Sequence, residues 1–412
     1  MKRIYIIVLL ALITYNLSKA QVKILYDATK AETAGSADWV IDADAHNLGY
    51  GSGPAVLGGG TESNAQQVPT PAQSGITSST VETYWDGAIS SWGIDMVKKG
   101  YYVETLPYNG SITYGSSSNA QDLSNYKVFI VDEPNIKFTT AEDTAIKQFV
   151  RNGGGLFMVS DHTGSDRNND GYDSPKIWQM IMDTNGVHPF PFGISVDYVD
   201  ISGTYPYVAN LPGDPLLHGV MGNVTEVMWS DGTTFTLKPA NNPTVKGVVY
   251  TTSSTTGNTG CLVAYSKYGA GRVVAMGDSS PTDDGTGDPG DNLYYGWTVD
   301  AGGNHERLIV NATIWLAGDS TLAIQEIDET SSVLVNQLTY PGFTKFVVSS
   351  SDNIANSEFC VYDMMGKLVM SFSNPVNSDI VIRNDKIGNG IYIYKLIVNG
   401  NAVKTGKFAI IK

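Results

Sequence analysis

Oxygen-bearing side chains are densest between residues 160 and 173 of this chain. Residues 166–173 read Asp-x-Asn-x-Asp-Gly-x-Asp, the spacing of a calcium-binding loop, in which alternate side chains point inward and the glycine permits a sharp turn. The twelfth position is Ile177 instead of the glutamate of an EF-hand. We expect a structural Ca²⁺ here, with an ion-free loop of Asx turns as the alternative. The predicted ligands are Asp166, Asn168, Asp170 and Asp173.

Asp161 and His162 directly precede this loop and follow the apolar run 156–159, where a strand would turn into a loop. A histidine at such an elbow can act as a general base or a metal ligand, because its ordinary pKa lies near neutrality. The alternative is a histidine hydrogen-bonded to loop backbone. Ser160 is a weaker candidate nucleophile, because the Gly-x-Ser-x-Gly pattern is absent.

A second acidic segment, residues 277–291, contains five aspartates and is too rich in glycine and proline to be a helix. Like charges at this density repel one another unless a cation or a cationic substrate group lies among them, and a solvated loop is the alternative. We predict Asp278 as a catalytic acid or ligand, and Asp283 and Asp284 as substrate- or ion-binding residues. His305, just downstream, is a candidate second base or ligand.

Short apolar strands and helices alternate along residues 21–318, which predicts an α/β fold with a doubly wound parallel sheet. Four of the predicted strands end at or just before an aspartate: Asp27, Asp132, Asp161 and Asp278. The working crevice of such a sheet lies outside the carboxyl ends of its strands, where Asp27 and Glu32 are expected to bind substrate. Helices are predicted at 77–99, with Ser79 and Glu82 as a capping box, and at 139–150, 174–181 and 304–316.

The composition excludes some partners. The 412 residues include 26 Lys and Arg against 41 Asp and Glu, a net charge of -15, whereas binding to nucleic-acid phosphates requires the opposite balance. We therefore expect no nucleic-acid partner. Residues 1–20 combine a basic start, an apolar run and a small-x-small cleavage site before Gln21, which predicts a signal peptide. No later apolar stretch is long enough to span a membrane, so we expect no integral membrane segment after signal cleavage. The signal peptide itself predicts that the chain is exported.

The last part of the chain changes character after a predicted linker at 319–335. Residues 336–412 contain short strands and an Asn399-Gly400 hairpin signal, which predicts a small β-sandwich. Three blocks resemble the type A C-terminal sorting domain of the type IX secretion system of Bacteroidetes: 361–367, 390–395 and 406–412. The resemblance implies the type IX machinery as a partner, passage through the periplasm, and a secreted or outer-membrane surface location.

The core also resembles a family. Residues 149–156 (Phe-Val-Arg-Asn-Gly-Gly-Gly-Leu) with the elbow after them, and residues 268–274 (Tyr-Gly-Ala-Gly-Arg-Val-Val), resemble the class I glutamine-amidotransferase-like superfamily, in its trehalose-utilisation-like branch. The resemblance implies a flavodoxin-like domain over 21–318 with its site at the elbow. The family's elbow nucleophile is a cysteine, but this chain has only Cys261 and Cys360, so amide hydrolysis by a thiolate is not expected.

Together these features predict a secreted hydrolase with its site at the carboxyl edge of the parallel sheet. It would use paired carboxylates or a catalytic divalent metal to activate water, and it would act on an extracellular carbohydrate polymer. The alternative is a non-catalytic, calcium-stabilised protein that binds glycans or serves at the cell surface. A fold hosts many functions, so the convergence of the predicted residues must decide between the two.

Overall fold

The computed structural model divides the chain into two compact units, Met1–Asp319 and Ser320–Lys412. The described residues are 21–34, 37–42, 71–183, 188–286, 296–299, 303–318, 333–340, 343–350, 356–363, 367–375, 378–398 and 401–410. The predicted signal peptide, most of the predicted linker, and Asp288 and Asp291 lie outside these residues. Among the described helices, none has both the length and the apolar character needed to cross a membrane.

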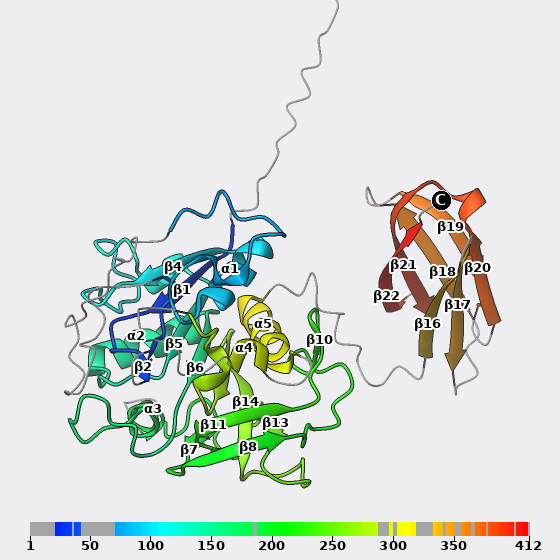
Figure 1. The fold of residues 1–412 in the computed structure, drawn as a ribbon. Helices are drawn as coiled ribbons and strands as arrows, with labels where there is room; N and C mark the ends of the chain where they lie inside the picture. The colour runs from blue at the N-terminus through cyan, green and yellow to red at the C-terminus, as the bar shows by residue number, and fades with distance from the viewer. Residues whose placement is uncertain are drawn as a thin grey trace, which may run out of the picture. The chain divides into compact units, whose positions relative to one another are not determined.

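The first unit is built on a nine-stranded mixed sheet (Figure 1). Five strands are parallel, in the order β4-β1-β5-β6-β15. Their bounds are Tyr102–Leu106 (β4), Lys23–Asp27 (β1), Val128–Asp132 (β5), Gly155–Val159 (β6) and Gly271–Met276 (β15). Every residue of β5 and β6 is buried, as expected for parallel strands covered on both faces.

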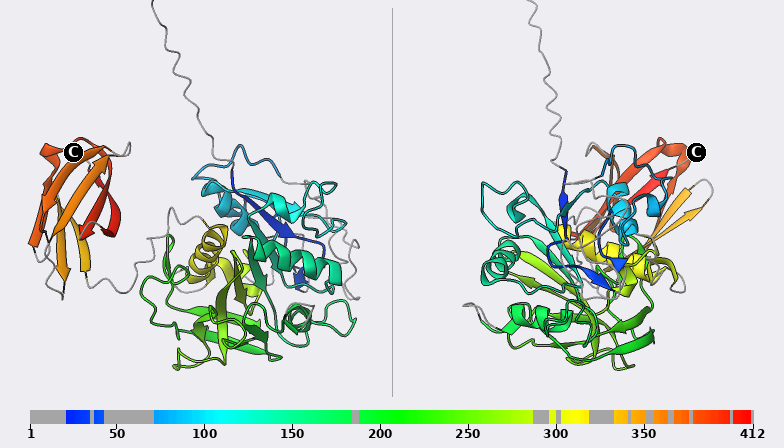
Figure 2. Two further views of the ribbon diagram at one scale, coloured as in Figure 1. Left: turned by 180° about the vertical axis from the view of Figure 1, so that it is seen from behind. Right: turned by 60° about the vertical axis from the view of Figure 1, so that its left-hand side comes forward.

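The rest of this sheet is antiparallel, so the expectation of a wholly parallel sheet is wrong for its second half. Strand β14 pairs with β15, β13 and β12, and β12 pairs with β7, all antiparallel. The bounds are Cys261–Tyr268 (β14), Lys246–Tyr250 (β13), Phe235–Leu237 (β12) and Ile194–Val196 (β7). Short two-stranded ladders complete the unit: Thr33–Ala34 with Ala37–Asp38 (β2, β3), Ile201–Tyr205 with Val227–Gly232 (β8, β11), and His218–Gly219 with Gly222–Asn223 (β9, β10). The green strands lie together, away from the blue strand β1, in each view (Figure 2).

The helices mostly follow the predicted pattern. The α-helices are Ser90–Lys98 (α1), Thr140–Arg151 (α2), Ser174–Asp183 (α3), Gly296–Val299 (α4) and Asn304–Ala317 (α5), and the 3₁₀ turns are Glu82–Tyr84 (η1), Leu123–Asn125 (η2) and Ser280–Thr282 (η3). The predicted start of α2 is confirmed, because Thr139 and Glu142 form a reciprocal capping box. Helix α5 packs against α1 and against β6 and β15.

The predicted helix 77–99 is wrong over its first half. Only Ser90–Lys98 is α-helical, and the expected capping box at Ser79 does not form. The break has a packing reason at Gly87, where a Cβ atom would overlap the backbone of Val40 and lie 2.6 Å from the amide nitrogen of Asp42. The apolar residues before Gly87 are therefore spaced as in a helix but lie on irregular backbone. Glu82 lies on a separate 3₁₀ turn.

The second unit consists of two antiparallel sheets that share one core. Their orders are β16-β17-β20 and β19-β18-β21-β22. The bounds are Val333–Tyr340 (β16), Phe343–Ser350 (β17), Ser357–Asp363 (β18), Leu368–Ser373 (β19), Ser378–Arg383 (β20), Gly390–Val398 (β21) and Asn401–Ile410 (β22), with a 3₁₀ turn at Asn384–Lys386 (η4). Phe346 of one sheet packs its ring against Phe359, Tyr394 and Phe408 of the other. This is the face-to-face packing of a β-sandwich.

Close packing of α5 on the sheet gives a stability prediction. A Cβ atom at Gly155 in β6 would lie 2.6 Å from the carbonyl oxygen of Leu316 and 2.7 Å from its Cβ. We expect Gly155→Ala to lower the free energy of unfolding by about 1–3 kcal/mol, the usual cost of overpacking. Gly75→Ala is the matched control, because nothing lies within 4 Å of the added atom. Urea unfolding measures both, and equal effects would contradict the packing argument.

Candidate functional site

Acidic residues end neighbouring strands of the parallel half of the sheet. Asp27 ends β1, Asp132 ends β5, and Asp161 follows β6 by two residues. Asp132 is paired in register with Val159 of β6, and that residue is in turn paired with Met276 of β15, two residues before Asp278. The register therefore brings the ends of these strands to one edge, as predicted. All four aspartates are buried.

Glu133 and Asp161 are held together by one guanidinium group. Arg167 donates from Nε to Oε1 of Glu133 at 3.1 Å and from Nη2 to Oδ2 of Asp161 at 2.8 Å. Glu133 is fully buried and Asp161 nearly so, whereas the Arg167 side chain is 28% exposed. Charge-assisted hydrogen bonds of this kind are the strongest available to a buried carboxylate. The position between the two carboxylates, where a cation would bind, is thus filled by Arg167.

Glu133 is the residue of this site that the sequence analysis missed. Its backbone has φ +44°, a left-handed conformation that is uncommon for a residue other than glycine. Its Oε2 accepts hydrogen bonds from Nε1 of Trp39 at 2.9 Å and from the hydroxyl of Ser279 at 2.7 Å. Strained backbone of this kind often occurs at functional sites. The only sequence signal was its place directly after Asp132.

Burial raises the pKa values of the acids at this edge. Burial is the largest cause for Asp161, whose pKa lies well above its ordinary value, and the nearby charge of Glu133 raises it further. Burial likewise raises the pKa of Asp278 to about 7, although the amide groups of Ser280 and Ser230 oppose this by donating to its carboxylate. The pKa of Asp132 is also well above its ordinary value, again chiefly through burial. Burial thus favours the protonated forms of these carboxyl groups.

His162, like Arg167, reaches solvent, with 20% of its side chain exposed. Its Nδ1 lies 2.9 Å from the carbonyl oxygen of Thr163, which can only accept, so Nδ1 carries a proton. The basic Nε2 then faces Oδ2 of Asp161 at 3.7 Å. Asp200 lies on the other side, with Oδ2 3.6 Å from Nδ1. The structure thus places the two predicted elbow residues together, with the basic nitrogen beside a buried carboxyl group.

The described part of the second acidic segment is not a solvated loop. Asp278, Asp283 and Asp284 are all buried, which corrects that alternative. Asp283 accepts the amide of Gly285 at 2.7 Å, and Asp284 accepts the amide of Ser91 in α1 at 2.8 Å. Asp283 and Asp284 therefore shape the turn and tie it to α1. Asp283 and Asp284 are predicted to bind substrate, but both are buried, so they could contact a substrate only from buried positions.

His305 is placed differently from the prediction of a second base. It is 1% exposed, and its Nδ1 lies 2.6 Å from the carbonyl oxygen of Gly296. Its Nε2 accepts the amide hydrogen of Met228 at 2.8 Å. Both ring nitrogens are thus committed to backbone, so the geometry gives His305 the role of joining α4, α5 and β11.

Asp27 and Glu32, the predicted substrate-binding pair, contact each other. Both are buried, and their carboxyl groups lie close enough to be joined by a hydrogen bond when one of them is protonated. Burial is the main cause that raises both pKa values, and the charge of Asp27 raises that of Glu32 further. Asp27 also accepts the hydroxyl of Thr29 at 2.9 Å. The pair therefore stores a proton at the end of β1.

The shared proton gives a prediction for stability against pH. A carboxyl group with a raised folded pKa contributes stability that is fully present below its unfolded pKa and is lost as pH rises through the folded value. Glu32→Gln supplies a permanent N–H donor to Asp27, so its unfolding free energy should fall less with rising pH. The expected difference is up to about 1.4 kcal/mol per pH unit above pH 5. Chemical unfolding at several pH values measures it, and Asp231→Asn at an exposed position is the control. Parallel pH slopes would contradict the shared proton.

The predicted calcium loop is built as a series of Asx turns. Asp166 accepts the amides of Asp170 at 3.0 Å and Gly171 at 2.7 Å, and Asn168 also accepts the amide of Asp170 at 3.1 Å. Asp173 is directed elsewhere, because its Oδ2 accepts the amide of Gly164 at 2.9 Å. Asp173 thus serves a different turn from the other predicted ligands, and calcium in this loop stays a prediction.

The calcium prediction can be tested on the loop itself. If Ca²⁺ binds there, Asp170→Ala should weaken it by at least about tenfold, whereas Asp363→Ala in the second unit should leave it unchanged. Calorimetric titration of the chelator-treated protein measures both. Binding that survives Asp170→Ala would place the ion elsewhere.

Comparisons with known proteins add little about this site. No family model matches the chain, and no curated protein matches it. Among solved structures, the "mmIFT52 N-terminal domain" is similar at TM-score 0.37 and 14% identity, over 54% of this chain and 88% of that one. The cytoplasmic protein STM3548 from Salmonella typhimurium has TM-score 0.34 and 13% identity, over 55% and 86%. The β-galactosidase from Bacillus circulans sp. alkalophilus has TM-score 0.30 and 11% identity, over 71% and 36%.

Proposed function

We propose that the chain is a secreted hydrolase whose site is formed by Glu133, Asp161, His162, Arg167 and Asp278 at the carboxyl edge of the parallel strands. One observation carries the proposal: a buried carboxyl group with a raised pKa, Asp161, lies beside Nε2 of the partly exposed His162. This places a carboxyl group whose protonated form is favoured beside a ring nitrogen that can accept a proton. His162 would take a proton from water, and Asp161 would protonate the leaving group.

Arg167 and Glu133 are positioning residues in this scheme. Arg167 holds Asp161 by its 2.8 Å hydrogen bond, and the charge of Glu133 favours the protonated form of Asp161. The geometry favours paired carboxyl groups over a metal at this point, because the guanidinium lies between the two carboxylates. The proposed substrate, an extracellular carbohydrate polymer, rests on the predicted export of an acidic protein. The alternative, a glycan-binding or cell-surface protein without catalysis, is favoured by the burial of most of these acids.

Two further assignments belong to the proposal. Numbered in chain order, the five parallel strands run 2-1-3-4-5, which supports a flavodoxin-like core. Burial raises the pKa of Cys261 to about 12, so its thiol is a poor nucleophile and the thiolate chemistry of the amidotransferase-like family is not proposed.

The β-sandwich of the second unit supports a type IX sorting domain. Export from a host with that secretion system should stop when residues 336–412 are removed.

Hydrolysis is tested on a panel of polysaccharides by the release of reducing ends. Asp161→Asn and His162→Gln should each lower kcat by about 10²–10⁴-fold, because each removes a proton-transfer group. His188→Gln is the matched control, because Nδ1 of His188 also contacts the next carbonyl oxygen, that of Pro189, at 3.1 Å. If the wild type binds a glycan without cleaving it, and the two variants lose that binding, the glycan-binding alternative is correct.

The pKa values predict the pH dependence of the reaction. Asp161 must be protonated to act as an acid, and Asp278, with a pKa of about 7, adds negative charge beside it when it ionises. Since that charge favours the protonated form of Asp161, Asp278→Asn should lower the pKa of Asp161. The alkaline limb of kcat/KM should therefore shift to lower pH in Asp278→Asn. An unchanged limb would show that Asp161 does not supply the proton.

A further inference from the structure

The segment of residues 197–200, which connects β7 to β8, runs beside the elbow of the proposed site. The amide of Thr163 donates to the carbonyl oxygen of Val199 at 2.9 Å. One residue further along, Oδ2 of Asp200 lies 3.6 Å from Nδ1 of His162. Two successive residues of the segment thus contact two successive residues of the elbow, so the segment borders the proposed site.

Three threonine side chains fix the first residue of this segment: Thr233, Thr234 and Thr236. The two carboxylate oxygens of Asp197 accept hydroxyl hydrogen bonds at 2.7 and 2.8 Å, and its carbonyl oxygen accepts the third. The amide of Thr233 also donates to the carbonyl oxygen of Gly277 at 2.7 Å, one residue before Asp278. The segment is therefore tied to both halves of the proposed site. Supporting bonds of this kind hold functional side chains in a fixed geometry.

Two side chains of this fixed segment reach solvent. Tyr198, between the anchored residues Asp197 and Val199, is 52% exposed, and the side chain of Asp200 is 51% exposed. Among the ion pairs of the described residues, Asp200 meets the imidazole of His162 and no lysine or arginine. We propose that Tyr198 and Asp200 are a substrate-binding pair that holds one neutral sugar unit of a polysaccharide. This inference rests on the proposed function, because the pair borders its catalytic residues.

The chemistry of the pair matches that of a sugar ring. A pyranose offers a face of C–H groups and a set of hydroxyl donors around it. The exposed ring of Tyr198 supplies a large apolar face with a polar tip, and the carboxylate of Asp200 accepts hydrogen bonds from hydroxyl groups. Because the backbone on either side of Tyr198 is already fixed, little conformational freedom is lost when a ligand binds there.

The charges at this place favour a neutral glycan over an anionic one. The cations of the adjoining loop and of α3, Arg167 and Lys176, are already paired with carboxylates, Lys176 with Asp173 at 3.4 Å. Asp200 therefore adds an exposed negative charge to a chain whose net charge is already -15. A uronic acid at this position would be repelled.

The test measures binding separately from cleavage, by native electrophoresis of the full chain in gels that contain a polysaccharide. All variants carry Asp161→Asn, so that the polymer is not cleaved. Tyr198→Ala should weaken binding to a neutral β-glucan or galactomannan by about tenfold, because it removes the aromatic face, and Tyr198→Trp should retain binding. Asp200→Asn removes the charge but keeps an acceptor oxygen, so it should bind polygalacturonate more tightly than the parent.

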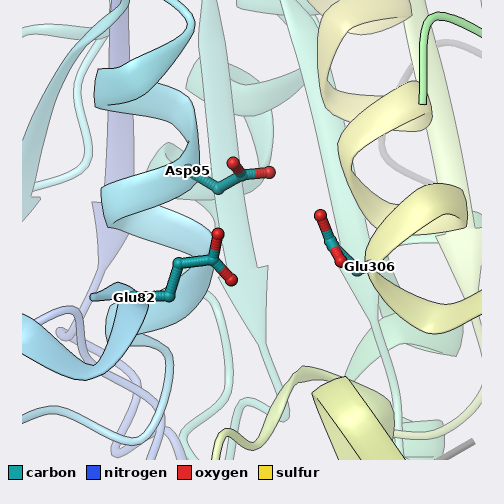
Figure 3. Close-up of side chains that lie close together, drawn as sticks. All are labelled: Glu82, Asp95 and Glu306. Atoms are coloured by element: carbon teal, nitrogen blue, oxygen red, sulfur yellow. The ribbon is translucent and has the colours of Figure 1, made fainter. Parts of the chain in front are cut away.

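Tyr84→Ala is the matched control. Tyr84 is 57% exposed and lies on η1, which packs against α1. It also has acidic neighbours, because Glu82 on the same turn lies close to Asp95 and Glu306 (Figure 3). If any exposed tyrosine near carboxylates bound the polymer, Tyr84→Ala would weaken binding as Tyr198→Ala does. We expect it to leave binding unchanged.

Kinetics on the chain with Asp161 intact separate this inference from the proposed function. Tyr198→Ala should raise KM by about tenfold and leave kcat within about threefold, as expected for the loss of binding that is equal in ground and transition states. Cleavage with KM and binding unchanged in Tyr198→Ala would overturn the pair but leave the hydrolase. Binding that depends on Tyr198 without any cleavage would support the pair and overturn the hydrolase. Absence of binding to neutral polysaccharides, or tighter binding of the parent to polygalacturonate, would overturn the pair.

Discussion

The guanidinium of Arg167 is the contact on which the arrangement of the sheet edge depends. Two carboxylates, Glu133 and Asp161, are buried side by side, and isolated charges in such positions are costly unless they are paired. Arg167 neutralises one unit of charge and fixes both side chains by directed hydrogen bonds. Removing it would leave two repelling carboxylates in the interior, so the pKa of Asp161 would rise further.

Arg167 lies in the loop that the sequence predicts to be a calcium site, so this loop also positions the arginine. The side-chain amide of Asn168 donates to the carbonyl oxygen of Asn135 at 2.6 Å, which ties the loop to the residues after β5. Asn135 in turn donates to the carbonyl oxygens of Ala31 at 2.9 Å and Glu133 at 3.0 Å. The segments that follow β1, β5 and β6 are thus joined by hydrogen bonds into one connected network. An ion in the loop, if bound, would stiffen the element that carries Arg167.

The sequence allowed prediction of features that depend on local patterns. The buried strands β5 and β6 follow from continuous apolar runs, and the start of α2 follows from a threonine, Thr139 or Thr140, that can cap a helix. Contacts between distant segments were out of reach. The pairing of Arg167 with Glu133 spans 34 residues, and the helix break at Gly87 depends on backbone of Val40 lying against it. Apolar spacing reports which side chains are buried, but it does not report what the backbone between them touches.

The buried acidic groups of this fold are neutralised in different ways, and the way in which each group is neutralised indicates its role. At the end of β1, Asp27 and Glu32 share a proton, so their charge depends on pH. At the end of β6, a fixed cation, Arg167, neutralises charge at any pH, and Asp161 can keep its proton for His162.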